Sequence, residues 1–282
     1  MVLWLTTDSK IDLAGYMLAI FIISSLVIVG LLYRHCRKGG EHIAKTMICT
    51  GALLLFSNVG SMLNYQLLPF SGDTIDNQLA SIDLAMGFHW LEFLYFSSLY
   101  PKFSTMLGIF YNSSLPQVIV VILLLGFKGH SVSLDNFLNC FVLSAIITIG
   151  FWFFFPSFGP TAMYTIPEDI VSLVNPVVGN DYGLYLKQLK TTSLLEISPN
   201  NIKGIIAMPS YHTVMAVLTC YAVAGVPRWR VFFFMINALV LLSIPMHGGH
   251  HFIDLIGGLL VSLVVIIVIS NRRCRPEPEE IA

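Results

Sequence analysis

The sequence predicts an all-α protein, a polytopic helical bundle embedded in a membrane. Hydrophobic residues make up 56% of the 282 residues and charged residues only 11%, whereas about a quarter of a soluble domain is usually charged. The apolar residues form long continuous runs, not the one-sided stripe of a helix on a soluble protein. This pattern excludes an ordinary soluble enzyme, and the net charge of −1 offers no basic face for nucleic acid.

Run length and flanking residues predict seven membrane-spanning helices, about six forming a core and the first being an N-terminal addition. The predicted spans are 13–33, 46–67, 103–127, 136–155, 209–226, 231–246 and 251–270. A basic cluster follows the first run, and no clear cleavage site does, so we interpret this run as a retained helix.

The basic residues predict how the spans are oriented. They gather in the connections after the first, third, fifth and seventh runs: Arg34, Arg37, Lys38, Lys45, Lys128, Arg228, Arg230, Arg272, Arg273 and Arg275. The positive-inside rule places these connections and the C-terminus in the cytoplasm. Two longer segments then lie outside: 71–102, whose acidic and aromatic residues predict a helix in the membrane interface, and 156–208.

Chemically active side chains gather at the predicted outer ends of the last three spans. Pro209 and Ser210 predict a helix start, which puts His212 in a first turn whose positive end attracts phosphate. His250 and Asp254 share one face of a helix at a spacing of i, i+4. The carboxylate can therefore fix the imidazole tautomer and leave its other nitrogen free as a nucleophile or base.

These two pieces, Pro-Ser-x-His at 209–212 and His-x-x-x-Asp at 250–254, resemble the type 2 phosphatidic acid phosphatase superfamily. The likeness is most specific over 202–258 and is closest to the branch of inositol phosphorylceramide synthase and inositolphosphotransferase-like bacterial membrane proteins. It implies phosphoryl transfer without a metal or other cofactor. His250 attacks phosphorus to form a phosphohistidine, His212 protonates the leaving oxygen and then activates water or an alcohol, and Asp254 orients His250.

The sequence departs from the family where the phosphatases carry basic residues. It contains no Lys-x6-Arg-Pro motif, and Ile244 stands where the family has an arginine ahead of the nucleophile. These differences favour the transferase-like branch. Because negative transition-state oxygens still need donors, we expect substrate binding by Ser210, Tyr211, His247, Lys187, Lys190 and Lys203.

Other interpretations stay open. A plain lipid phosphate phosphatase, of the phosphatidic acid or undecaprenyl pyrophosphate type, needs the same groups. A zinc site built from His212, His247, His250 and Asp254 is the rival enzyme interpretation. A transporter with a histidine proton relay is the non-enzyme interpretation. We expect His251 to lie in the membrane interface and to take no part in catalysis.

The expected organisation is an N-terminal helix with a basic loop (1–45), a phosphatidic-acid-phosphatase-like catalytic domain (46–271) and a cytoplasmic tail (272–282). The substrate is a phospholipid or another lipid-linked phosphate, and the site faces outward from the plasma membrane, the inner membrane if the chain is bacterial. His212 and His250 should face each other across about 5–8 Å, room for one phosphoryl group. The headgroup, the acceptor and the oligomeric state stay open.

Overall fold

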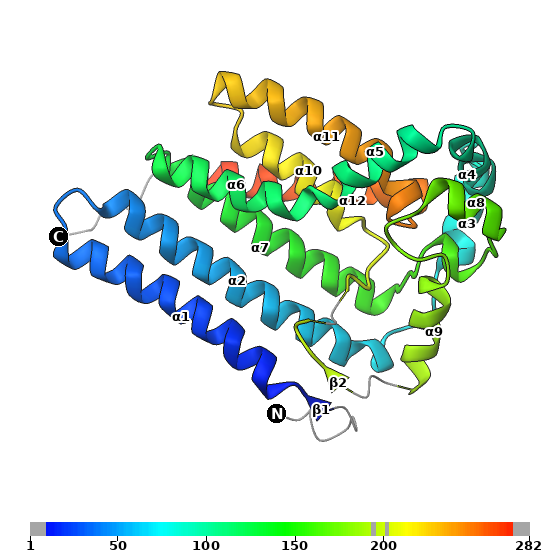
Figure 1. Ribbon diagram of the computed structural model, residues 1–282, viewed down its shortest axis with the longest axis horizontal. Helices are drawn as coiled ribbons and strands as arrows, with labels where there is room; N and C mark the ends of the chain where they lie inside the picture. The colour runs from blue at the N-terminus through cyan, green and yellow to red at the C-terminus, as the bar shows by residue number, and fades with distance from the viewer. Residues whose placement is uncertain (1–9, 193–195, 201–202, 273–282) are drawn as a thin grey trace.

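A computed structural model describes residues 10–192, 196–200 and 203–272. Residues 273–282, which make up most of the predicted tail and include Arg273 and Arg275, lie outside this part of the chain, as do residues 1–9. The described part is mainly helical, and its longest helices run side by side (Figure 1). The predicted all-helical membrane bundle is therefore confirmed.

The helices of the bundle are α1 (Leu13–Cys36), α2 (Glu41–Leu67), α5 (Pro101–Asn112), α6 (Ser114–Phe127), α7 (Ser131–Phe154), α10 (Tyr211–Ala222), α11 (Pro227–His247) and α12 (Phe252–Arg272). Of the described helices, α1, α2, α7, α11 and α12 are each long and apolar enough to cross a membrane. Large side chains on the outside of α1, such as Leu13 at 68% and Phe21 at 70% exposure, suit contact with lipid because water would make their exposure unfavourable.

The predicted third span is two helices, because α5 and α6 meet at a bend of 45°. Pro116 lies in the first turn of α6 and has no N–H to offer the carbonyl of Asn112. The hydroxyls of Ser113 and Ser114 donate to carbonyls of the preceding turn, at 2.6 and 2.8 Å. The bend places the end of α5 beside the start of α10, where Tyr111 meets His212.

The predicted fifth span is the short helix α10, which has 12 residues and a length of about 18 Å. A membrane interior of about 30 Å needs a longer helix. Helices α6, α7, α11 and α12 surround α10, and Val214 and Leu218 are fully buried. The helix is thus the centre of the bundle, and its length is set by packing rather than by the bilayer.

The remaining helices α3, α4, α8 and α9 gather at one end of the bundle, on the right in Figure 1, and the two strands lie at its lower edge in that view. The bounds of these elements are α3 (Asp76–Ala85), α4 (Trp90–Ser98), α8 (Glu168–Val174), α9 (Tyr182–Thr192), β1 (Lys10–Ile11) and β2 (Glu196–Ile197), and the short helices are η2 (Leu68–Phe70) and η3 (Pro160–Ala162). The two strands are parallel. The segment predicted as one interfacial helix therefore forms two helices, α3 and α4, separated by Gly87, whose φ is +80°.

Candidate active site

The start of α10 holds His212 next to the start of α12. Ser210 caps α10, and its hydroxyl accepts a hydrogen bond from the Thr213 N–H at 3.4 Å. The Ser210 N–H in turn donates to the Asp254 carbonyl at 3.0 Å. The predicted helix start is therefore present, and this main-chain bond fixes it to the segment that carries the second motif.

His250 and Asp254 form a buried pair just before and within the first turn of α12. Nδ1 of His250 lies 3.2 Å from Oδ2 of Asp254, which is fully buried. The same Oδ2 accepts the His251 N–H at 2.9 Å. A carboxylate in this position keeps the imidazole proton on Nδ1, so that Nε2 of His250 has a free lone pair.

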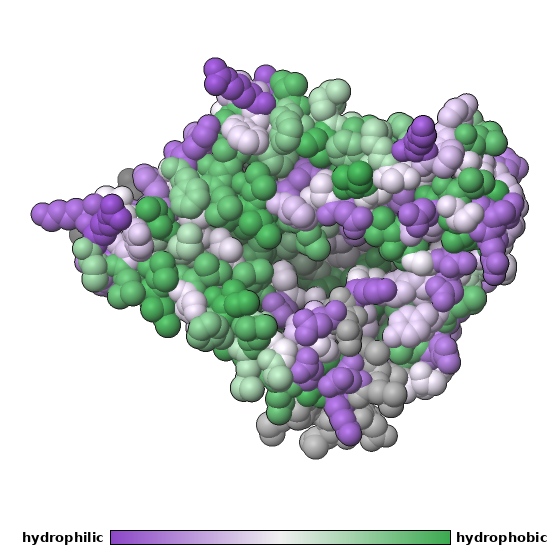
Figure 2. Space-filling model, in the orientation of Figure 1, coloured by the Kyte–Doolittle hydropathy of each residue, from purple (hydrophilic) through white to green (hydrophobic). Residues whose placement is uncertain are grey.

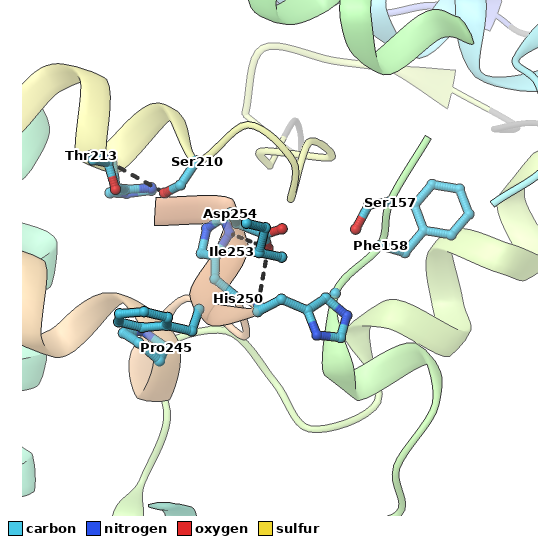
Figure 3. Close-up of polar contacts among 12 residues, drawn as sticks. Ser157, Phe158, Ser210, Thr213, Pro245, His250, Ile253 and Asp254 are labelled. Atoms are coloured by element: carbon cyan, nitrogen blue, oxygen red, sulfur yellow. Dashed lines mark hydrogen bonds and ion pairs between the residues drawn. The ribbon is translucent and has the colours of Figure 1, made fainter. Parts of the chain in front are cut away.

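The two predicted catalytic histidines face each other. Their ring centroids are 6.4 Å apart and their planes are inclined at 67°, within the gap expected for one phosphoryl group. In Figure 3 a dashed line joins His250 to Asp254, and the labelled residues of α10 and of the loop after α7 lie around this pair. Segments far apart in the chain thus form one polar site.

Tyr111 fixes the second histidine from a helix that the sequence did not connect with the site. Its ring stacks on His212 at a centroid distance of 4.2 Å and an angle of 20°, and its hydroxyl lies 3.4 Å from Nδ1. Because stacking limits the rotation of the imidazole, Tyr111 holds its Nε2 edge in one direction. Tyr111 and His212 are 101 positions apart, so no local sequence pattern predicts their contact.

Glycines form the loop that carries His250. Gly249 has a φ of +60°, and Gly159, in the facing loop, has a φ of +80°. A Cβ on Gly159 would lie 2.1 Å from the carbonyl oxygen of Gly249, so only glycine fits this close approach. The two loops therefore touch directly beside His250, the residue that follows Gly249.

His247 is buried against α5. Its Nε2 lies 2.8 Å from the Ser104 carbonyl and donates to it. Gly108 makes room for the ring, because a Cβ there would lie 3.0 Å from Cε1. Within the described residues Nδ1 of His247 has no hydrogen-bond partner, so the ring keeps one polar atom that a ligand or water can satisfy.

Three of the other predicted substrate-binding residues have main-chain partners. Lys187 donates to the Ala162 carbonyl at 2.8 Å, and Lys190 donates to the Gly72 carbonyl. The Tyr211 hydroxyl donates to the Phe141 carbonyl at 2.9 Å and so faces α7. The structure therefore gathers Ser210 with the histidines and Asp254, while these three side chains hold the surrounding segments.

Lys203 has a different surrounding. Its ammonium lies 5.6 Å from the ring centroid of Tyr182, and its main-chain N–H donates to the Tyr65 hydroxyl at 3.0 Å. Among the described residues its ammonium has no carbonyl partner of the kind that holds Lys187 and Lys190.

His251 is buried inside the protein, contrary to the expectation that it lies in the membrane interface. It is 1% exposed and stands between two carboxylates of α3, with Nε2 3.8 Å from Asp76 and Nδ1 3.6 Å from Asp83. Burial opposes its charge, but the two carboxylates outweigh burial and raise the pKa of His251 to about 9. Sequence reasoning missed both partners, because it interpreted the α3 segment as interfacial.

No preformed metal site accompanies these groups in the part of the chain that the structure describes. No cluster of three or more histidine, cysteine, aspartate or glutamate side chains there has the arrangement of metal ligands. The zinc interpretation therefore lacks a ligand set among the described residues.

The fold and site define a multi-pass membrane protein with a paired-histidine centre at one end of its bundle. A sequence model of the PAP2 superfamily matches residues 77–268, and the chain belongs to this superfamily. The match contains both motifs and begins at α3. Membership supports an enzyme of the phosphatase or phosphotransferase type that acts on a lipid or lipid phosphate. No curated protein and no solved structure matches the chain significantly.

Proposed function

We propose that this protein transfers the phosphoryl group of a lipid-linked phosphate to an acceptor through a phosphohistidine on His250. One observation carries the proposal. A histidine with a carboxylate on Nδ1 faces a second histidine across 6.4 Å. One imidazole is thereby prepared as a nucleophile and the other is placed to handle protons on the opposite side of the phosphorus.

In the first step, Nε2 of His250 attacks phosphorus and the bond to the lipid oxygen breaks. The negative charge of the bound phosphate favours the protonated form of His212. This ring gives its proton to the lipid oxygen, which leaves as an alcohol. Asp254 stabilises the positive charge that develops on His250, because its Oδ2 accepts from Nδ1 at 3.2 Å. The phosphoryl group is then covalently bound to the enzyme.

In the second step, the now neutral His212 takes a proton from water or from an acceptor alcohol. The oxygen attacks phosphorus, the bond to Nε2 of His250 breaks, and the electron pair returns to the imidazole. The product is inorganic phosphate with water or a new phosphate ester with an alcohol. His212 ends protonated, as it began.

Main-chain groups can stabilise the phosphate in place of the arginines of the phosphatase branch. The first N–H groups of α10, at Tyr211 and His212, have no acceptor within the helix, and the helix dipole favours an anion there. Lys203 is exposed, and its ammonium, unlike those of Lys187 and Lys190, donates to no carbonyl among the described residues.

The surroundings support a substrate from the lipid phase. Apolar side chains lie beside the loop that carries Gly249, among them Trp90, Leu94, Ile166, Ile170 and Met246. Figure 2 shows a hollow in one face of the molecule, over the segment that leads into α10, with a hydrophobic surface beside it. Polar chemistry next to apolar surface suits a phosphate attached to a lipid.

The proposed site faces the extracytoplasmic side. The connections that carry Arg34, Arg37 and Arg228 are at the ends of the helices opposite to the histidines. This charge bias supports a cytoplasmic position for that end under the positive-inside rule. A cysteine-labelling reagent that does not cross membranes should modify a cysteine introduced at exposed Glu168 but not Cys36 in intact cells.

Within the family we favour the transferase-like branch that resembles inositol phosphorylceramide synthase. The test incubates purified protein with a panel of headgroup-labelled phospholipids, with and without inositol. Release of phosphate alone indicates a phosphatase, and a new inositol-containing lipid indicates a transferase. His250→Ala should abolish either product. An exposed histidine, His130→Ala, provides the matched control and should retain full activity.

Two results would contradict the proposal. The first is a fully active His250→Ala variant, which removes the nucleophile assignment. The second is a wild-type protein that turns over none of the lipid phosphates while moving protons or ions across liposomes, which would favour the transporter interpretation.

A further inference from the structure

His251, the residue after the proposed nucleophile, joins the nucleophile loop to α3. Its ring is 1% exposed and lies within 4 Å of two side chains of α3, Asp76 and Asp83. Its main-chain N–H donates to Asp254 at 2.9 Å. Through its backbone, His251 thus contacts the carboxylate that orients His250. Through its ring, it contacts two other buried carboxylates.

Each α3 carboxylate also holds a different backbone segment. Asp76 accepts the Ser157 hydroxyl at 2.7 Å and the Phe158 and Gly159 N–H groups at 3.1 and 2.9 Å. Asp83 binds the start of α12. Asp76 therefore fixes the loop whose Gly159 lies against Gly249, directly before the nucleophile.

Asp83 caps α12 from outside that helix. Its carboxylate accepts the Phe252 N–H at 2.8 Å and the Ile253 N–H at 2.9 Å. These are first-turn N–H groups, which have no acceptor within α12. Asp83 therefore fixes the backbone that carries Asp254, while the His251 ring beside it balances its charge.

The charges around His251 require it to be positive. Asp76 and Asp83 face it from α3, Asp254 faces it from α12, and His250 adjoins it in the chain. Buried carboxylates repel one another unless a cation lies between them. No lysine or arginine contact to these carboxylates occurs within the described residues, so the imidazolium is the cation available.

We propose that His251 is a positioning residue whose imidazolium charge holds the nucleophile loop on α3 and thereby aims Nε2 of His250 at the phosphate. This role rests on the proposed function. The positive ring keeps Asp76 and Asp83 together, Asp76 sets the Gly159 loop, and Asp83 sets the start of α12. Loss of the charge releases both supports of the loop without removing any group that touches the substrate.

The titration of His251 gives this role a measurable signature. Asp76 and Asp83 raise its pKa to about 9 against the opposing effect of burial, compared with about 6.5 in an unfolded chain. Its contribution to stability is therefore complete below pH 6.5 and is lost as the pH rises through about 9. Activity that depends on the charge should fall over the same range.

The test compares His251→Gln with the wild type by kcat, KM and their pH profiles. We expect kcat to fall by about 100-fold, the usual effect of displacing a reacting group by about 1 Å, with KM nearly unchanged. The alkaline fall of kcat near pH 9 should be absent in the variant. Asp135→Asn, which breaks the 2.7 Å ion pair with Lys45 and is not part of the site, serves as the control.

A second variant serves if His251→Gln does not fold. Asp83→Asn removes one carboxylate, so the alkaline fall of kcat should move to lower pH while the protein remains folded. An unchanged profile in that variant, or an active His251→Gln with the wild-type alkaline fall, would overturn the positioning role.

A melting experiment separates failure of this inference from failure of the proposed function. The melting temperature of the wild type should fall between pH 6.5 and 9.5, and this fall should be much smaller in His251→Gln. If the wild type turns over no lipid phosphate, the proposed function and the positioning role both fail. If the wild type is active and its melting temperature does not respond to pH in this way, only the proposed role of the His251 charge is contradicted.

Discussion

Asparagine in place of Asp254 should inactivate the protein without unfolding it. Asn has the size of Asp and fits the same buried position. Its side-chain oxygen can still accept the His251 N–H, now 2.9 Å from Oδ2. The same oxygen can also accept from Nδ1 of His250, because the single atom Oδ2 serves both donors. The substitution therefore keeps both hydrogen bonds and removes the negative charge that stabilises the positive imidazole formed when His250 attacks phosphorus.

The magnitude follows from the geometry of this pair. In a Ser-His-Asp triad the corresponding change lowers kcat by about 10⁴-fold through the wrong tautomer, an effect that the shared Oδ2 does not force here. The separation here, 3.2 Å, is longer than the ~2.7–2.9 Å of the strongest charge-assisted bonds, so we expect a smaller loss. A loss of about 10³-fold in kcat corresponds to about 4 kcal/mol in the activation barrier.

The assay measures kcat and KM for the best lipid substrate in detergent micelles, with the melting temperature of the same preparation. KM should change little, because Asp254 does not touch the substrate. A variant that keeps more than a tenth of the wild-type kcat would refute the electrostatic role of Asp254. A variant that melts far below the wild type would instead assign Asp254 a mainly structural role.

Two further changes test the parts of the site that surround the histidines. Gly159→Ala should reduce both stability and kcat, because its Cβ would lie 2.1 Å from the Gly249 carbonyl oxygen at a φ of +80°, a strain of about 1–3 kcal/mol; normal melting and kcat would contradict the close approach. Tyr111→Phe should keep most of the activity, because the 4.2 Å stack on His212 remains, whereas Tyr111→Ala should lower kcat by about tenfold or more through loss of orientation. Equal activities of the two Tyr111 variants would refute the stacking role.

The sequence was informative about the fold because the bilayer imposes a simple rule on it. A run such as 13–33 is apolar and long, and it forms α1 (Leu13–Cys36), since a backbone in lipid must satisfy its hydrogen bonds within a helix. The same rule did not locate the 45° bend between α5 and α6. Pro116 carried that signal, but prolines are tolerated inside many membrane helices.

The site could be predicted where its chemistry is local. His250 and Asp254 lie one helical turn apart, and the structure pairs them at 3.2 Å. The pairing of His212 with His250 depended on the topology, since both lie at helix ends that the alternation of spans brings to one side. The partners of His251 had no such signal, because Asp83 contacts it from 168 positions earlier and only packing brings α3 to α12.

The most direct test of the central claim is a search for phosphohistidine at His250. In the variant His212→Gln, a lipid-like substrate with a nitrophenyl phosphate group can phosphorylate the enzyme, because nitrophenolate leaves without needing a proton. Dephosphorylation is slow without the base at position 212. Mass spectrometry under alkaline conditions should then find one phosphoryl group per chain, on the peptide that contains His250. Turnover of this substrate with no phosphate on that peptide, or with phosphate on another residue, would contradict covalent catalysis by His250.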